Sequence, residues 1–188
     1  MPKALVTLLF FAGIFGNCYS DQHDTAKCGK NSTVFTYSNY VVYEQFNPEK
    51  GTNDILVLER NKENNCTRNI SKAIFVLKEQ ENGFFINLFQ NFIFIDYGTG
   101  PDARTLSVYN FKTGKKVLDT PYSDTLIKIG KDSVSIWIES SDTNFTKCAE
   151  YQKWKENGLE AGIVVEHYFD LKSLKLYKTQ NSKCVAKQ

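Results

Sequence analysis

Short runs of β-branched and aromatic residues alternate with short polar turns along most of the chain, from Val34 onward. Residues 105–111 show this most clearly, because apolar and polar positions alternate with the period of an extended strand. Extended geometry places Leu106, Val108 and Asn110 on one face and Thr105, Ser107, Tyr109 and Phe111 on the other. Gly114 supplies the positive φ of the hairpin turn that follows. Further strands are expected at residues 34–46, 54–60, 73–78, 84–97, 116–120, 126–129, 133–138, 163–171 and 175–179.

The stretch at residues 84–97 (FFINLFQNFIFIDY) is the most apolar part of the chain after its first twenty residues. It is too long for one ordinary strand. Because Gln90 and Asn91 interrupt it, we expect two strands that meet there.

One segment departs from the strand pattern. Residues 147–157 (KCAEYQKWKEN) lack β-branched side chains and are rich in helix formers, and Gly158 follows as a plausible C-cap. Cys148, Tyr151 and Trp154 would share one face at helical spacing. The sequence therefore predicts one short helix in an otherwise β-rich chain.

Four aromatic residues recur at three-residue spacing inside the first expected strand. In one continuous strand, Tyr37 and Tyr43 would lie on one face and Tyr40 and Phe46 on the other. Either both faces are core, or one is an exposed aromatic patch available to a protein or a glycan.

The chain of 188 residues suggests one β-rich domain over residues 21–188. We expect an all-β, antiparallel meander or sandwich, or an incomplete propeller, with one short helix. A lipocalin-like barrel is the alternative, since size and two disulfides suit it. The early Gly-x-Trp signature of that barrel is missing, because the tryptophans are Trp137 and Trp154.

Residues 1–20 have the pattern of a secretory signal peptide. Lys3 precedes an apolar segment at residues 4–15, and small residues at Cys18 and Ser20 suit cleavage after Ser20. The protein is then secreted or periplasmic. The alternative is a lipid anchor on Cys18, although Asn17 replaces the small residue usual in that motif. No later segment is long and apolar enough to span a membrane.

Removal of the leader leaves Cys28, Cys66, Cys148 and Cys184. An even number of cysteines in an exported chain predicts disulfides. Three pairings are possible, and we favour Cys28 with Cys66 and Cys148 with Cys184, which tie each end of the chain to its nearer half. No metal site is expected, because there is no Cys-x-x-Cys pair and no histidine near a cysteine.

The formal net charge is only +2, and lysine and arginine are dispersed among acidic residues. A basic stripe able to neutralise several phosphates is therefore missing from the sequence, and nucleic acid is not an expected partner.

The loop at residues 96–104 (DYGTGPDAR) is the most distinctive motif. As a binding loop, Asp96 and Asp102 would offer carboxylates, Gly98 and Gly100 would expose backbone amides, and Arg104 would offer a planar fork for an anion. The structural alternative is a long turn in which Arg104 pairs with Asp96 or Asp102. The glycines are not followed by Lys-Ser or Lys-Thr, so the loop is not a phosphate loop, and no cofactor is expected.

Two features carry a resemblance to known proteins. Residues 106–117 and 166–176 are similar to the inner hairpin of β-propeller blades. Residues 92–184 resemble a group of uncharacterised exported bacterial proteins, through the Asp96–Arg104 loop, Cys148 before a helix with Trp154, and the late Cys184. The resemblance implies an exported β-rich protein and no activity.

No set of catalytic residues stands out. There is no Gly-x-Ser-x-Gly motif, the cysteines are expected in disulfides, and His167 lies within an expected strand. We therefore expect a non-catalytic exported binding or envelope-associated protein with an unknown protein or glycan partner. The alternatives are a hydrolase with a spatially assembled carboxylate site, or a lipocalin-like carrier of a small apolar ligand.

Overall fold

The computed structural model describes residues 23–61, 66, 70–98, 100 and 104–187, and of residues 124–126 it describes the backbone alone. The predicted signal peptide, residues 1–20 with Cys18, lies outside the described residues. The described part of the chain is mostly β, as the sequence predicts, with one α-helix.

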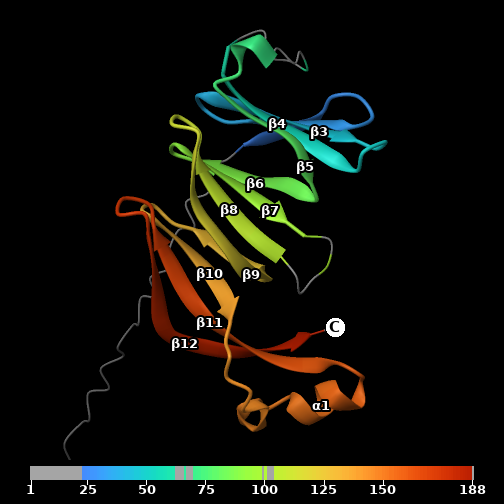
Figure 1. The fold of residues 1–188 in the computed structure, drawn as a ribbon, viewed down its shortest axis with the longest axis vertical. Helices are drawn as coiled ribbons and strands as arrows, with labels where there is room; N and C mark the ends of the chain where they lie inside the picture. Colours follow the sequence, from blue (N-terminus) through green and yellow to red (C-terminus); the bar gives the residue numbers. More distant parts are fainter. Residues whose placement is uncertain (1–22, 62–65, 67–69, 99, 101–103, 188) are drawn as a thin grey trace, which may run out of the picture.

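The described strands form two antiparallel sheets, and within each sheet every strand pairs with its neighbour in the sequence (Figure 1). The first sheet contains β1 (Asp24–Lys27), β2 (Ser32–Thr36), β3 (Tyr40–Asn47), β4 (Thr52–Glu59) and β5 (Phe75–Glu81). The second contains β6 (Gly83–Phe89), β7 (Phe92–Tyr97), β8 (Arg104–Asn110), β9 (Lys115–Ile129), β10 (Ser133–Glu139), β11 (Glu160–Asp170) and β12 (Lys175–Lys187). The short helices are η1 (Ile70–Lys72), η2 (Phe145–Lys147) and α1 (Tyr151–Glu156).

The apolar sequence of β7 is explained by its position between two cores. Ile93 and Ile95 join a cluster with Val42 and Val57 of the first sheet, so this cluster holds the two sheets together. Phe94 points to the opposite face and joins a second cluster formed within the second sheet. A strand buried on both faces has no polar face to keep, so its sequence is continuously apolar.

The lipocalin-like barrel is wrong for this chain. The described strands form two open sheets, whose order ends at β1 and β5 in one and at β12 and β6 in the other. The first sheet packs against β6–β8 at one end of the molecule, while β11, β12 and α1 lie at the other end (Figure 1).

The interpretation of residues 34–46 as one strand is also wrong. A turn separates β2 from β3, and the Tyr37 N–H donates to the Tyr40 carbonyl at 2.9 Å. Tyr37 and Tyr43 therefore lie in different apolar clusters rather than on one strand face. Phe46 is 41% exposed.

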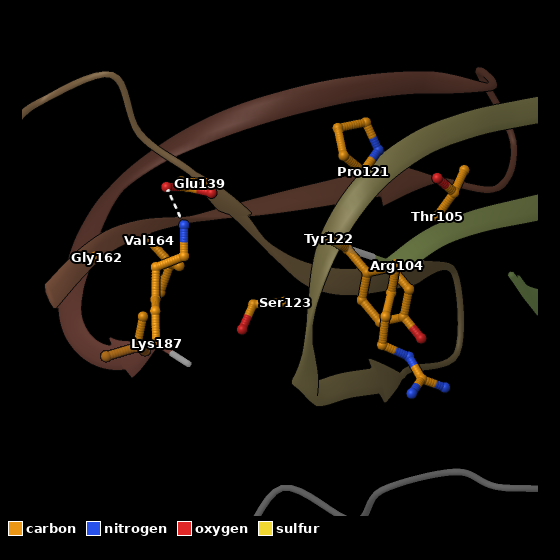
Figure 2. Close-up of a pocket in the computed structure, with 10 residues that line it drawn as sticks. Arg104, Thr105, Pro121, Tyr122, Ser123, Glu139, Gly162, Val164 and Lys187 are labelled. Carbon is orange, nitrogen blue, oxygen red and sulfur yellow. Dashed lines mark hydrogen bonds and ion pairs between the residues drawn. The ribbon is translucent and has the colours of Figure 1, made fainter. Parts of the chain in front are cut away.

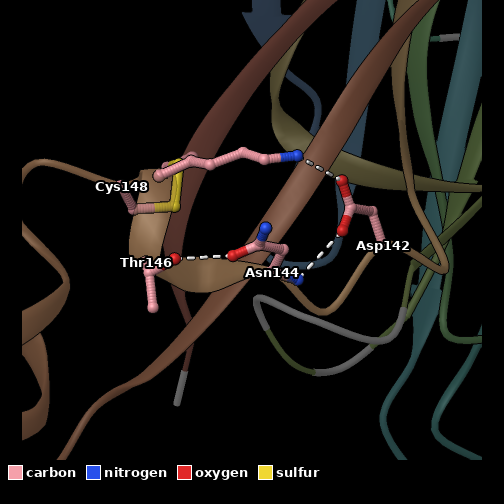
Figure 3. The surroundings of a disulfide bond; sticks show 6 residues. Asp142, Asn144, Thr146 and Cys148 are labelled. Carbon is pink, nitrogen blue, oxygen red and sulfur yellow. Dashed lines mark hydrogen bonds and ion pairs between the residues drawn. A yellow bond between two sulfur atoms is a disulfide. The ribbon is translucent and has the colours of Figure 1, made fainter.

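The two disulfides join Cys28 to Cys66 and Cys148 to Cys184, the pairing favoured by the sequence. The predicted helix is shorter than expected, because residues 145–147 form a 3-10 turn before α1 begins at Tyr151. Figure 3 shows this region: Asp142 accepts a hydrogen bond from the Asn144 N–H, and Cys148 is buried beside the end of β12. The disulfide therefore fixes the connection between β10 and β11 to the last strand.

Candidate functional site

A cavity of about 240 Å³ lies where β8 and β9 approach the far ends of β11 and β12 (Figure 2). Its described lining comes from the five consecutive strands β8 to β12. The lining residues are Arg104, Thr105, Pro121, Tyr122, Ser123, Glu139, Gly162, Val164, Val185 and Lys187.

The shape of β11 and β12 creates this space. Their pairing shifts register between Val165 and His167, and beyond the shift both strands curve towards the centre of the molecule (Figure 1). Such irregularities bend a strand and increase its twist. The bend turns Val164 and Gly162 towards β9, where they line the cavity.

Gly162 allows the Lys187 stem to lie close to the sheet. A β-carbon at Gly162 would come within 2.8 Å of Lys187 Cδ. Lys187 instead extends along the cavity, and its ammonium group donates to Glu139 Oε1 at 2.7 Å (Figure 2). This pair is partly exposed, so its main effect is to orient Lys187 rather than to stabilise the fold.

At the other end of the cavity, an ion pair with a buried carboxylate fixes the position of Arg104. Asp96 is only 3% exposed. It forms an ion pair with the Arg104 guanidinium, whose Nε donates to Oδ1 at 3.1 Å. The Tyr122 hydroxyl donates to the same oxygen at 2.9 Å. A buried carboxylate requires such partners, and they in turn fix the positions of Arg104 and Tyr122 in the cavity wall.

The cavity combines apolar walls with fixed polar groups. Pro121, Val164 and Val185 supply apolar surface, and the charged residues Arg104 and Lys187 lie on opposite sides of the lining (Figure 2). Most small-molecule sites combine an apolar lining with a few oriented polar groups in this way. The arrangement can bind a small ligand that has an apolar body and a group that accepts hydrogen bonds.

The ionisable groups of the lining are already engaged in ion pairs. Arg104 pairs with Asp96, and Lys187 pairs with Glu139, the one carboxylate among the described lining residues. Such groups suit recognition of a ligand better than transfer of a proton.

The structure brings two of the five predicted loop residues together. Asp96 and Arg104 form the ion pair that the structural alternative proposed, and Arg104 also reaches the cavity. The Gly98 N–H donates to the Asn82 carbonyl at 3.1 Å, and a β-carbon added at Gly100 would meet no atom within 4 Å. Asp102 lies outside the described residues.

Sequence reasoning missed the rest of the cavity. Tyr122, Gly162, Val164 and Val185 occupy ordinary strand positions, and no motif marks them. β11 and β12 extend past the hairpin that the pattern predicts, so the pattern gave no signal for the parts of these strands that line the cavity.

The two histidines lie away from this cavity. His167 is a strand residue whose Nδ1 lies 3.0 Å from the Val165 carbonyl oxygen. The His23 ring packs against Tyr37, with 5.0 Å between ring centroids. Within the described ranges, no group of three His, Cys, Asp or Glu side chains is placed to hold a metal ion.

A wider groove of about 570 Å³ crosses the first sheet beside the turn between β3 and β4. Its lining includes the exposed side chains of Phe46 and Ile70 together with Lys78 and Glu79. Among its described lining residues, the groove lacks the buried, oriented charged pair that distinguishes the cavity at Arg104.

Comparison of the chain with protein-family models, with curated proteins and with solved structures finds no significant match. None of the described helices is long and apolar enough to cross a membrane.

Proposed function

We propose that the protein is a non-catalytic, exported binding protein that takes a small amphipathic ligand in the cavity between β8–β9 and the ends of β11–β12. The observation that carries this proposal is the fixed guanidinium of Arg104 in the wall of a cavity with apolar sides. Fixed groups bind ligands well, because little conformational freedom is lost on binding.

The proposal of export rests on two features. The leader pattern at residues 1–20 is typical of a secreted or periplasmic chain. The two disulfides are compatible with an oxidising compartment outside the cytoplasm. A lipid anchor through Cys18 is the alternative route to the same compartment.

The lining indicates the chemistry of the ligand. A cavity of about 240 Å³ is somewhat smaller than a site for a drug-sized molecule. Apolar walls favour a ring or a short alkyl chain, and Arg104 and Lys187 favour a carboxylate, sulfonate or phosphate group on it. We therefore expect a small organic anion.

The test is binding of anilinonaphthalene sulfonate (ANS), which has both an aromatic body and an anionic group and which fluoresces when it leaves water. Val185→Trp should fill the cavity and remove the fluorescence enhancement. The matched control is Ala186→Trp, since Ala186 is the exposed neighbour of Val185 and points to the opposite face of β12.

Two results would contradict the proposal. One is ANS fluorescence that is equal in the wild type and in a folded Val185→Trp variant. The other is loss of the signal in Ala186→Trp to the same extent. Circular dichroism and thermal unfolding of both variants establish that they are folded.

A further inference from the structure

Two tyrosines form a stacked pair on the surface of the last hairpin. Tyr168 of β11 and Tyr177 of β12 are direct cross-strand partners, and their rings stack with centroids 4.9 Å apart and an interplanar angle of 19°. They are 40% and 39% exposed. Aromatic cross-strand pairs stabilise a sheet, and an exposed pair also offers flat apolar surface to a partner.

The pair belongs to a row that crosses four strands. Lys128 pairs with Ser135, Ser135 with Tyr168, and Tyr168 with Tyr177. Residues paired across neighbouring strands project from the same face of a sheet. The row therefore places a lysine, a hydroxyl and two aromatic rings side by side.

A second aromatic group lies on the same face, one row away. Trp137 pairs with Glu166, which lies two residues before Tyr168 on β11. The ammonium group of Lys183 lies 4.6 Å from the centroid of a Trp137 ring. This contact is a cation–π interaction, and it fixes a second lysine beside the aromatic surface.

The acidic groups of this face are occupied by the protein itself. Glu166 accepts hydrogen bonds from Ser135 Oγ and Asn181 Nδ2, each at 2.7 Å. Asp170 accepts from the backbone N–H groups of Lys172 and Ser173 in the hairpin turn, at 3.0 and 2.6 Å. These neutral donors fix both carboxylates in place and leave their charges intact, so Glu166 and Asp170 offset part of the positive charge of the lysines.

The lysines of this face are spread around the aromatic groups. Lys128 lies at one end of the tyrosine row, Lys175 lies two residues from Tyr177, and Lys183 lies over Trp137. Lys128 and Lys175 are exposed. A partner that fits this surface has flat apolar faces and negative charges at intervals between them.

We propose that the face formed by Lys128, Trp137, Tyr168, Lys175, Tyr177 and Lys183 binds an anionic glycan. The C–H faces of sugar rings stack on the exposed tyrosines, and sulfate or carboxylate groups on the chain pair with the lysines. The two flat, stacked rings match the flat C–H faces of sugar rings, and this shape favours a glycan over a protein. This face adjoins the cavity, because Lys183 pairs with Val164 and Trp137 pairs with Ser123, but the proposal does not rest on the function proposed for the cavity.

The probe is a short heparin oligosaccharide, and a neutral dextran oligosaccharide of similar length is the uncharged control. Titration calorimetry on the full mature chain should show heparin binding that weakens as salt rises, because exposed charges are screened. Dextran should bind much more weakly. Equal affinity for the two glycans would overturn the role given to the lysines.

Variants separate the face from general attraction between opposite charges. Tyr168→Ala with Tyr177→Ala should weaken heparin binding by about tenfold or more, as for the loss of two aromatic stacking contacts. Phe46→Ala, which removes an equally exposed aromatic ring on the first sheet, should leave affinity unchanged. Unchanged binding in the tyrosine variant would overturn the proposal and would leave a charge-only or protein-binding surface.

A charge-matched pair completes the test. Lys128→Gln with Lys175→Gln should weaken binding, whereas Lys153→Gln with Lys155→Gln on α1 should not, although both pairs remove two exposed charges. Equal losses in the two pairs would also overturn the proposal. Tyr168→Ala with Tyr177→Ala should retain ANS binding, since neither tyrosine lines the cavity, so failure of the cavity proposal and failure of this one are distinguishable.

Discussion

At the residue scale, the buried carboxylate of Asp96 determines how the wall of the cavity is built. It lies beneath the surface with Arg104 and Tyr122 as its hydrogen-bond donors. Removal of one partner leaves a charge that is buried without compensation, and this costs more than the pair itself contributes.

Arg104→Ala should therefore lower the free energy of unfolding by on the order of 2–4 kcal/mol. This loss is smaller than the largest losses found for fully buried ion pairs, because Arg104 is partly exposed. Chemical denaturation measures this change. Arg60→Ala is the control, because Arg60 donates to the Tyr37 carbonyl and has no such role towards a buried acid. Equal losses in the two variants would show that the ion pair with Asp96 contributes no more to the free energy of unfolding than an ordinary hydrogen bond does.

Glu44 provides a pH-dependent test of the contact between the sheets. Its Oε1 accepts from the Phe85 N–H of the second sheet at 2.8 Å, and burial raises the pKa of its carboxyl above the ordinary value of 4.5. An acid whose pKa is raised in the folded state binds its proton more tightly there. The folded state is then penalised as pH rises through that pKa.

Glu44→Gln keeps the accepting oxygen and removes the charge. It should gain stability relative to the wild type near neutral pH, and the gain should vanish as pH falls below the ordinary glutamate pKa. Unfolding curves between acidic and neutral pH measure the difference. Glu166→Gln should behave in the opposite way, because hydrogen bonds led by that of Ser135 lower the pKa of Glu166. The same trend in both variants would contradict this account.

The sequence predicted the Asp96 and Arg104 pair as one of two alternatives, because the residues lie in one short loop. It could not predict Tyr122, which reaches Asp96 through strand pairing with Arg104 across a hairpin. Contacts of this kind depend on register, and a register is fixed only when the sheet is assembled.

At the element scale, the sequence predicted where most strands lie and was less successful with their ends. The strands β6 and β7 meet at the expected turn. The run at residues 34–46 is instead a tight hairpin, because Ser38 and Asn39 turn the chain within an aromatic stretch. The helix begins at Tyr151 rather than at Lys147, because residues 145–147 form a 3-10 turn and the disulfide-bonded Cys148 lies between the two.

Substitution of Cys148 and Cys184 by alanine should lower the free energy of unfolding by about 3–4 kcal/mol in the chain-entropy model. The bond spans 36 residues and fixes α1 to the last strand. Hydrogen exchange should therefore show α1 and the end of β12 losing protection first. The same double substitution at Cys28 and Cys66 should leave α1 protected. Loss of α1 protection in both variants would contradict the local role of the bond.

Gly83 tests the junction between the two sheets. A β-carbon there would lie 2.7 Å from Tyr97 Cε1 and 2.8 Å from Gln80 Cβ. Gly83→Ala should lower stability by about 1–3 kcal/mol, the usual cost of overpacking. Gly100→Ala, where nothing lies within 4 Å, should have little effect on the melting temperature. Equal melting temperatures for the two variants would show that the junction accommodates an added methyl group without loss of stability.

At the scale of the whole molecule, the alternating pattern predicted an antiparallel β fold. It did not determine whether the sheets stay open or close into a barrel. Barrel and sandwich share the same strand periodicity, and they differ in whether the first and last strands of a sheet pair. Here the last two strands bend without closing the sheet, and the cavity lies inside that bend. The site could not be predicted because it depends on this bend.

The central claim is that this cavity is where a ligand binds. The most direct test is a titration of the isotopically labelled protein, residues 21–188, with ANS, followed by backbone amide chemical shifts. We predict that the largest shifts fall on Thr105, Ser123, Gly162, Val164 and Val185, which line the cavity from four different strands. Shifts confined to the exposed hairpin around Tyr168, or scattered without any cluster at the cavity, would contradict it.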